Sequence, residues 1–581
     1  MRNGPEIILG ASISLVLLGG AMMARSEDVQ IHSGRAGRPG GRLVIAQRSE
    51  PRTLNPLAAL DAGSREVIGL MTADLIHIDR GSFQTIPSLV KTWTVSKDGR
   101  IYTMHLRQGL RFSDGHSFDV EDVLFTFRVH LDERIRSAQR ELLIIGGKPI
   151  AVRKIDPYTV QFELPAPRAA ADRLFDNVGI LPKHLLENSY NEGSLRAAWS
   201  VTENARKIAG LGPFRLKEYI PGQRLTLERN PYYWKIDSGA RRLPYLDEIV
   251  FAFTGSENGQ VLRFLSGEAD LIGGLNPENF AVLKEQQQRR GFRVQDLGPG
   301  LEYTFLVFNQ NNLRSDFRSI QEKQEWFRRV AFRQAVSTAI DRDAIIRLVY
   351  RGMAAPLRGH VTDGNKVWID NATPRAPRSH EMARQLLKSA GFSWNSANKL
   401  IDPSSKEVTF SILTSAGNAP RGQIATMIQD DLKQLGIAVS IVSLEFRAMM
   451  DRVFNTFEYE AAVMTLASGD TDPNSEMNVW TRAGSTHLWN MNGAAAPDWE
   501  IEIDQLMRRQ LESLNFSDRK RMYDRVQRLV AVNLPLICIA SPHLLVGASG
   551  TVGNLRPSIL PPYSLWNADE LFIKEDTTRN Q

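Results

Sequence analysis

Cysteine is almost absent from the 581-residue sequence, which contains only Cys538. A single thiol cannot form a disulfide within the chain, so the fold must rest on a hydrophobic core, which a chain of this length builds easily. Cys538 lies in the apolar run 534–540, a pattern typical of a buried strand, and we expect an unreactive thiol there. The content of 42% hydrophobic and 23% charged residues is that of an ordinary globular protein.

Motifs of the common enzyme classes are missing as well. The sequence contains no H-E-x-x-H, no G-x-S-x-G and no Walker loop, and its 10 histidines are dispersed without metal-ligand spacing. Acidic neighbours such as Glu121 and Asp122, or Asp430 and Asp431, fit solvated helix faces better than acid/base pairs. We therefore predict no catalytic residue, no metal site and no cofactor.

Long runs of one residue class are rare. The net charge is only +6 and has no Lys/Arg tract, so nucleic-acid binding is not predicted. The one long apolar stretch, Ile7 to Met23 after Arg2, predicts a cleaved signal peptide over residues 1–24. A retained membrane anchor is the competing interpretation, because the stretch approaches spanning length. No cysteine lies there, which excludes a lipoprotein, and residues 25–40, rich in Gly and Arg, predict a linker.

Strand and helix patterns alternate along the rest of the chain, which predicts a mixed α/β protein. Helical spacing over 119–132 predicts a helix that Asp119 caps. Patterns over 407–414, 422–435 and 437–444 predict a β-α-β unit. Further strands are expected at 41–46, 101–106, 159–164, 246–253 and 534–540, with a hairpin over 213–227. Further helical segments are expected at 327–351, 380–390 and 499–531.

Short motifs follow one another in an order that carries a resemblance. They include Leu54-Asn-Pro56, Trp93-Thr-Val-Ser-Lys-Asp-Gly99, Phe112-Ser-Asp-Gly115, Asp119-Val-Glu-Asp-Val123, Arg229-Asn-Pro-Tyr-Tyr-Trp234, Leu243-Pro-Tyr-Leu-Asp247 and Asp431-Leu-Lys-Gln-Leu-Gly-Ile437. Each motif is weak alone. In this order and together they resemble the extracellular solute-binding proteins of family 5, which are the dipeptide- and oligopeptide-binding proteins of ABC importers.

The resemblance implies a two-lobed periplasmic binding protein of type II, the large peptide-binding variety, with mixed sheets and a hinge. Lobe 1 would comprise residues 41–300 and the returning segment 536–581, and lobe 2 would comprise residues 301–535. A ligand would be enclosed between the lobes, which would close around it.

The function implied by the resemblance is capture of di- or oligopeptides in the periplasm and their delivery to the permease subunits of an ABC importer. The protein would be a monomer without enzymatic activity. The same scaffold could instead bind an oligosaccharide, an opine-like conjugate or a metal chelate. A membrane-tethered solute receptor for signalling is a further alternative, and a secreted hydrolase is the third.

Two loops and several aromatic residues are the candidate ligand contacts. The first loop supplies Asp61, Ala62 and Gly63, and the second supplies Leu466, Ala467, Ser468, Gly469, Asp470, Thr471 and Asp472. The resemblance implies that Asp470 pairs with the α-ammonium group of a peptide through a charge-assisted hydrogen bond. Asp472, which precedes Pro473, fits either a ligand contact or a turn. Tyr303, Trp480 and Trp489 are the candidate aromatic contacts.

Overall fold

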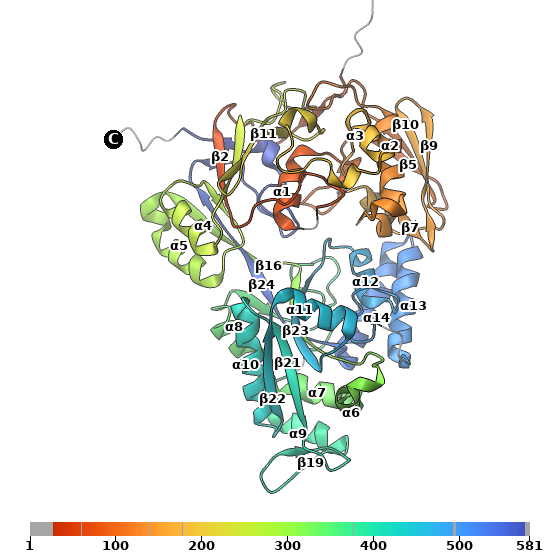
Figure 1. Cartoon of the computed structure of the whole chain (residues 1–581), viewed down its shortest axis with the longest axis vertical. Coiled ribbons are helices and arrows are strands. Elements are labelled where there is room, and N and C mark those ends of the chain that lie inside the picture. The colour runs from red at the N-terminus through yellow and green to blue at the C-terminus, as the bar shows by residue number, and fades with distance from the viewer. Residues whose placement is uncertain are drawn as a thin grey trace, which may run out of the picture.

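Two lobes, one above the other, make up the molecule in Figure 1. The computed structural model describes residues 27–59, 61–137, 139–176, 178–375, 377–491 and 495–575. The predicted signal peptide, residues 1–24, lies outside these ranges. Among the helices of the described residues, none is both long and apolar enough to span a bilayer.

The first sheet of lobe 1 contains the predicted hairpin. Strands β11 (Phe214–Ile220) and β12 (Arg224–Arg229) pair antiparallel, and the turn between them contains Gly222 with φ of +73°. Strand β14 (Glu248–Phe253) pairs antiparallel with β12 and parallel with β2 (Arg42–Gln47). The left-handed backbone at Gly222 explains why a glycine follows Pro221 at the turn.

The second sheet of lobe 1 is antiparallel, in the order β5 (Val90–Val95), β6 (Ile101–Leu106), β10 (Thr159–Glu163) and β9 (Ala151–Asp156). Helix α2 (Val120–Leu131) packs on this sheet with Val120, Val123 and Phe127 inside a shared core. Asp119 caps the helix as predicted, because its carboxylate accepts a hydrogen bond from the Glu121 amide at 2.8 Å.

Lobe 2 contains the predicted β-α-β unit. Strands β21 (Thr409–Ser415) and β22 (Ala438–Leu444) are parallel, and helix α10 (Ala419–Lys433) connects them. Strand β23 (Ala461–Ala467) joins β21 in parallel and pairs antiparallel with β17 (Glu302–Phe308). Gly436, with φ of +80°, stands just after α10 in the left-handed conformation that ends many helices.

Two of the predicted helical segments are interrupted. Residues 327–351 form α7 (Val330–Ala339) and α8 (Arg342–Leu348), because Asp341 turns the chain and caps α8 by accepting from the Ala344 amide at 2.8 Å. Residues 499–531 likewise divide into two helices that pack together, since Asn515 caps the second. These are α13 (Asp498–Glu512) and α14 (Phe516–Asn533). The segment 380–390 forms α9 (His380–Ser389), as expected.

Strand β24 (Leu536–Ser549) passes through both lobes, near the middle of Figure 1. Its first part pairs with β17 and with β18 (Ala354–Pro356) of lobe 2. From His543 onward it pairs with β16 (Phe292–Pro299) and β15 (Leu271–Ile272). The observed strand is therefore longer than the predicted run 534–540. Its pairing with strands of lobe 2 continues to Pro542, beyond residue 535, where lobe 2 was expected to end.

Shorter elements complete the two lobes. In lobe 1 they include α1 (Ala62–Met71), α3 (Lys183–Asn191), α4 (Glu257–Leu265), α5 (Pro277–Arg290), β1 (Gln30–His32), β3 (Ile76–Ile78), β4 (Thr85–Pro87), β7 (Ile144–Ile145), β8 (Lys148–Pro149), β13 (Lys235–Asp237), β25 (Val552–Gly553) and β26 (Phe572–Ile573). In lobe 2 they include α6 (Arg318–Phe327), α11 (Phe446–Asp451), α12 (Met477–Trp480), β19 (Ser393–Trp394) and β20 (Leu400–Ile401). Strand β1 pairs in parallel with β13, so the predicted linker is not free chain at these positions.

Two carboxylates expected on solvated helix faces are buried instead. Asp122 accepts hydrogen bonds from the amides of Asp119 and Lys183, and burial raises the pKa of Asp122 to about 6. Asp431 accepts from the Asp341 amide at 2.9 Å, and burial raises its pKa as well. The expectation was wrong because these acids tie neighbouring segments together. Cys538 is buried as predicted, and burial raises the pKa of its thiol to about 12.

Candidate functional site between the lobes

The carboxyl ends of three parallel strands of lobe 2 lie at one edge of its sheet. Helices α10 and α11 begin after β21 and β22, where Asn418 and Glu445 cap them. Strand β23 ends at Ala467 and leads into the loop 468–474. This loop contacts lobe 1, so this edge of the sheet faces the other lobe. In open α/β sheets, ligands bind in the crevice outside the carboxyl ends of the strands.

Asp470, the first candidate for reading a ligand's ammonium group, contacts an arginine of lobe 1 instead. Its two carboxylate oxygens accept hydrogen bonds from Arg173 Nε and Nη2, each at 2.5 Å. Ser468 donates its hydroxyl to the Asp470 carbonyl at 2.8 Å, which shapes the loop. Gly469 lies between them, and Leu466 and Ala467 end β23.

Asp472 has the turn role that the sequence left open. Its carboxylate accepts from the Asn474 amide at 3.0 Å. Arg519 of α14 donates to both carboxylate oxygens, at 2.9 and 2.6 Å, and both side chains are buried. Asn365 donates its side-chain amide to the Thr471 carbonyl at 2.7 Å. Both sides of this part of the loop are thus anchored within lobe 2.

The three predicted aromatic residues lie in the core of lobe 2. Trp480 and Trp489 are 0% exposed and Tyr303 is 1% exposed. The Tyr303 hydroxyl and the Trp480 indole N–H both donate to Glu476, at 2.9 and 3.2 Å. These contacts satisfy the polar ends of large buried rings and stabilise the support beneath the loop.

In lobe 1, the predicted residues Asp61, Ala62 and Gly63 begin helix α1. The Asp61 carboxylate accepts from the amide and the hydroxyl of Ser64, both at 2.8 Å. A Cβ atom at Gly63 would lie 2.9 Å from the amide nitrogen of the Gln47 side chain, so a larger residue would displace that side chain. Ala62 is exposed.

Side chains that the sequence analysis missed lie near one another between the lobes. Tyr563 of lobe 1 is 41% exposed and has a left-handed backbone with φ of +49°. Burial raises the pKa of Tyr563, and the charges of Glu302 in lobe 2 and Glu66 in α1 raise it further. Desolvation by the surrounding protein also raises the pKa of Glu66, to about 7, although Glu66 is only half-buried.

Glu302 begins β17, and its surface is exposed to solvent. Protein atoms nevertheless surround much of its carboxyl group, and this desolvation raises the pKa of Glu302 as well. Within the described ranges, neither Glu66 nor Glu302 has a hydrogen-bond or ion-pair partner. Arg421 in the first turn of α10 lies near enough to Glu302 for the two charges to interact, and it donates to the Thr465 hydroxyl at 3.1 Å. A glutamate in an alternating strand gives no sign in the sequence that it meets another lobe, which is why these positions were missed.

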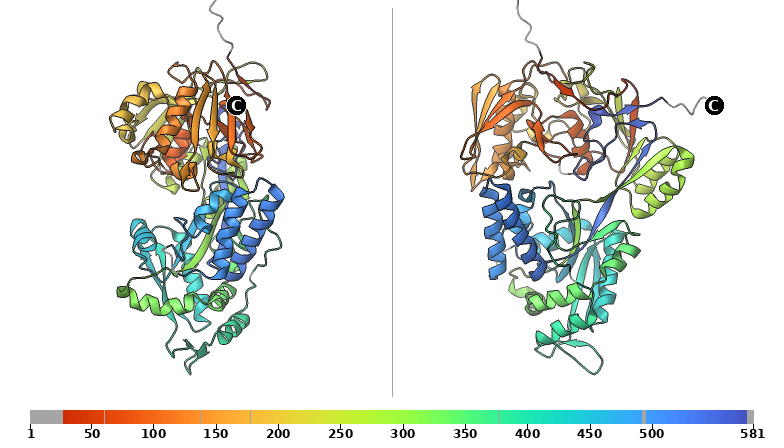
Figure 2. Two further views of the ribbon diagram at one scale, coloured as in Figure 1. Left: turned by 90° about the vertical axis from the view of Figure 1, so that its right-hand side faces the viewer. Right: turned by 180° about the vertical axis from the view of Figure 1, so that it is seen from behind.

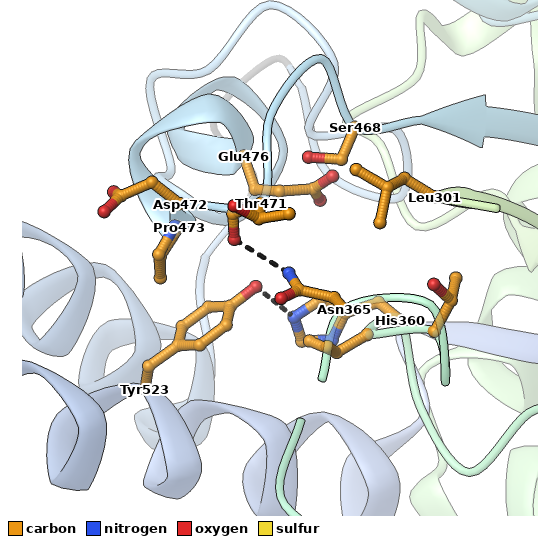
Figure 3. A pocket seen from close by; sticks show the side chains of 11 residues that line it. Leu301, His360, Asn365, Ser468, Thr471, Asp472, Pro473, Glu476 and Tyr523 are labelled. Carbon is orange, nitrogen blue, oxygen red and sulfur yellow. Dashed lines mark hydrogen bonds between the residues drawn. The ribbon is translucent and has the colours of Figure 1, made fainter. Parts of the chain in front are cut away.

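A small pocket lies under the loop 468–474 (Figure 3). It has room for about one water molecule. The pocket is lined by Leu301, His360, Val361, Thr362, Asn365, Ser468, Thr471, Asp472, Pro473, Glu476 and Tyr523. His360 Nε2 lies 3.1 Å from the Tyr523 hydroxyl, and burial lowers the pKa of His360 to about 3. The pocket supports the loop and is too small for a peptide or a sugar.

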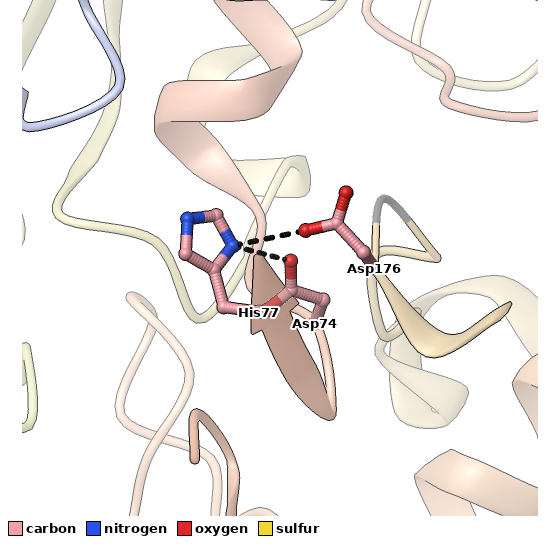
Figure 4. Close-up of side chains that lie close together, drawn as sticks. All are labelled: Asp74, His77 and Asp176. Atoms are coloured by element: carbon pink, nitrogen blue, oxygen red, sulfur yellow. Dashed lines mark hydrogen bonds and ion pairs between the residues drawn. The ribbon is translucent and has the colours of Figure 1, made fainter. Parts of the chain in front are cut away.

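Within the described residues, one group of side chains has metal-ligand spacing (Figure 4). It consists of Asp74, His77 and Asp176. His77 Nδ1 lies 2.9 Å from Asp74 and 3.3 Å from Asp176. Burial opposes its charge, but the two carboxylates outweigh this effect and raise the pKa of His77 to about 9. Arg80 also donates to both oxygens of Asp176, at 2.9 and 3.1 Å. The protein's own cations therefore already neutralise the acids that a metal would need.

Comparisons with known proteins agree with this architecture. The family model described as bacterial extracellular solute-binding proteins, family 5, matches residues 84–487. A probable ABC transporter-binding protein of Deinococcus radiodurans is 25% identical over 523 residues, which cover 86% of this chain and 87% of the relative. The oligopeptide-binding protein AppA of Bacillus subtilis is 26% identical over 532 residues, which cover 87% of this chain and 88% of the relative.

Solved structures share the fold at low sequence identity. AppA of Bacillus subtilis in complex with a nonapeptide has a TM-score of 0.71 and 22% identity, over 93% of this chain and 100% of that chain. MelB of Agrobacterium fabrum in complex with stachyose has a TM-score of 0.73 and 22% identity, over 93% of this chain and 86% of that chain. AgaA of A. tumefaciens R10 in complex with agropinic acid has a TM-score of 0.70 and 21% identity, over 92% of this chain and 99% of that chain. The predicted two-lobed fold with mixed sheets is confirmed.

Proposed function

The chain belongs to the bacterial extracellular solute-binding proteins of family 5, and from this premise we propose that it is the periplasmic substrate-binding component of an ABC importer. It captures a small solute between its lobes and delivers it to the permease subunits as a monomer, without catalysis. The observation that carries the proposal is the pair of lobes joined through β24, with strand-end loops of lobe 2 facing lobe 1.

Peptides are the first candidate ligands. AppA of Bacillus subtilis binds oligopeptides, as its name says, and the match spans most of both chains. An extended peptide obtains affinity from main-chain hydrogen bonds, and this mode leaves side chains in roomy, wet pockets. Contacts would come from the loop 466–472 and from residues 61–63. We add Glu66, Glu302, Arg421 and Tyr563, because they combine both signs of charge with an exposed aromatic ring.

A non-peptide solute is the second candidate, and one observation favours it. Both carboxylate oxygens of Asp470 are bonded to Arg173, so a peptide's ammonium group would have to displace a guanidinium group to reach them. Structural neighbours include complexes with stachyose and agropinic acid. An oligosaccharide, an opine-like conjugate or a metal chelate would not need a free carboxylate in this loop.

Mass spectrometry of the protein purified from the periplasm under native conditions tests the proposal. We expect a bound solute that is released unchanged on denaturation, and a thermal-shift screen with peptide mixtures, stachyose and opine-like conjugates identifies its class. A ligand that is consumed during incubation would overturn the assignment as a binding protein. No stabilisation by any solute class would count against solute capture altogether.

Export is tested by N-terminal sequencing of the fractionated protein. A cleaved signal peptide predicts a periplasmic product that lacks about the first two dozen residues. An intact Met1 on a membrane-bound product would instead support the tethered receptor for signalling.

A further inference from the structure

A second contact joins the lobes on the side where α13 and α14 lie beneath the β5–β6–β10–β9 sheet. Figure 1 and the rear view of Figure 2 both show these helices directly below that sheet, whereas β24 crosses nearer the middle. The contact consists of the segment Arg168–Arg173 of lobe 1 and the loop 470–474 with the end of α13 in lobe 2. The lobes are thus held at two separate places.

The Arg173–Asp470 pair is the centre of this contact. Its two hydrogen bonds of 2.5 Å form the bidentate, charge-assisted arrangement that is among the strongest polar contacts in proteins. Each side chain is only 16% exposed. Arg173 also donates to the Phe83 carbonyl at 3.0 Å, so its guanidinium group is fixed in lobe 1 before it meets Asp470.

Main-chain contacts surround this ion pair. The Asn474 side-chain amide donates to the Ala169 carbonyl at 2.8 Å, and the Ala169 amide donates to the Leu511 carbonyl of α13 at 2.6 Å. Arg168 is buried close enough to Asp472 for the carboxylate to act on its charge. Two arginines of lobe 1 therefore face two aspartates of lobe 2 at this contact.

We propose that Arg173 and Asp470 form a latch that holds the lobes closed, and that Asp470 serves closure and does not read a cationic group of the ligand. The latch biases an equilibrium between open and closed forms, because the pair exists only when the lobes meet. Apparent ligand affinity falls in proportion to the closed fraction, so the latch also adjusts affinity for any ligand. Only this last consequence rests on the proposed function.

The direct test measures lobe separation without any ligand. Dyes on Lys148→Cys in lobe 1 and Lys388→Cys in lobe 2 report the separation by single-molecule energy transfer, since both positions are exposed. Cys538 is buried and does not compete for the label. Arg173→Gln, Asp470→Asn and the double variant are compared with the labelled parent chain. Arg215→Gln is the matched control, because Arg215 pairs with Glu228 within lobe 1, with Nε 2.7 Å from the carboxylate.

The latch predicts that each single variant raises the ratio of open to closed molecules about tenfold or more, as expected for loss of a charge-assisted pair. The double variant should open the protein no further than the worse single variant, because both residues act through one contact. Arg215→Gln should leave the distribution unchanged. Circular dichroism spectra identical to those of the parent chain exclude misfolding of a single variant. The double variant lacks both charges of the pair, so an unpaired buried charge cannot explain its behaviour.

A second readout separates the latch from ligand recognition. The probes are a peptide found in the thermal-shift screen and its N-acetylated form. The latch predicts that each of Arg173→Gln and Asp470→Asn lowers the affinity for the free and the acetylated peptide by the same factor. The proposal would be overturned if Asp470→Asn alone weakened binding, and only of the peptide with a free amino end, while Arg173→Gln left the lobe separation unchanged. Because the first experiment uses no ligand, its outcome does not depend on whether solute capture is the correct function.

Discussion

Buried arginine–carboxylate pairs serve different purposes in this molecule, depending on which lobes they join. Asp470 pairs across the lobes, whereas Asp472, two residues later, pairs with Arg519 inside lobe 2. Neither partner could be identified from the sequence. Arg173 is 297 positions away from Asp470, and no local pattern marks an arginine that will meet a distant acid.

The Asp472–Arg519 pair yields a prediction about stability. Asp472→Asn leaves the buried Arg519 guanidinium group without its counter-charge, and we expect a loss of about 3–5 kcal/mol in the free energy of unfolding. Urea denaturation measures it. Asp518→Asn is the control, because Asp518 pairs on the surface with Arg521 and should cost less than about 1 kcal/mol. Equal losses in the two variants would mean that the pair does not anchor the loop.

The His77 cluster yields a prediction about pH. Asp74 and Asp176 raise the pKa of His77 from 6.5 to about 9, so the folded state holds the proton more tightly than the unfolded state does. This stabilisation is fully present below pH 6.5 and is lost as the pH rises through 9. His77→Gln should therefore lower the free energy of unfolding more at pH 6 than at pH 9.5, by at most about 3 kcal/mol.

Denaturation at both pH values measures the difference for His77→Gln. His105→Gln is the control, because His105 Nδ1 contacts the neutral hydroxyl of Thr159 at 3.2 Å. A loss in His77→Gln that is equal at both pH values would show that the cluster holds no extra proton.

At the scale of elements, two glycines should respond in opposite directions when each is replaced by alanine. Gly436 follows α10 with φ of +80°, and a Cβ there would lie 2.3 Å from the Asn398 carbonyl oxygen. Gly436→Ala should cost about 1–3 kcal/mol, because both the backbone and the contact oppose it. Gly69 lies inside α1, and an added Cβ would meet no atom within 4 Å beyond the adjoining helix backbone, so Gly69→Ala should stabilise by about 0.5–1 kcal/mol. Chemical denaturation of both variants checks this prediction, and two changes of the same sign would contradict it.

Most elements could be predicted because their hydrophobic period is local. The β-α-β unit of β21, α10 and β22 and the capped helix α2 follow from spacing and turn residues alone. The interruptions at Asp341 and Asn515 were missed, because a polar cap inside a continuous apolar pattern does not change the period. The ends of β24 were also missed, since its pairing partners lie in two different lobes.

The candidate site could be predicted only in outline. The resemblance pointed to the loop 466–472, which contacts lobe 1 through Asp470, and to residues 61–63, whose role in ligand binding stays a prediction. The large aromatic residues Trp480 and Trp489 could not be assigned from sequence, because a large ring packs equally well in a core, which is where they lie. Glu302 of lobe 2 comes close to Tyr563 of lobe 1 only when the lobes are assembled.

At the scale of the whole molecule, ligand binding must increase stability by mass action. A solute that binds only the folded protein adds about 2.7 kcal/mol at 100 times its dissociation constant. We expect this increase in the free energy of unfolding for the solute identified by mass spectrometry. An inert solute of the same charge is the control. No increase at saturation would mean that the solute is not a ligand of the folded state.

Closure gives the last prediction. The chain crosses between the lobes at Gly300 and again near Pro542, and these crossings lie together, because the Gly300 amide donates to the Pro542 carbonyl at 3.2 Å. Two adjacent crossings permit a rotation of one lobe against the other. A ligand enclosed between the lobes favours the closed form, so small-angle scattering should give a smaller radius of gyration on saturation. If the Arg173–Asp470 latch already favours closure, the decrease should be larger in Arg173→Gln than in the unmodified protein. An unchanged radius in both proteins with a confirmed tight ligand would mean that the ligand enters a rigid, preformed pocket.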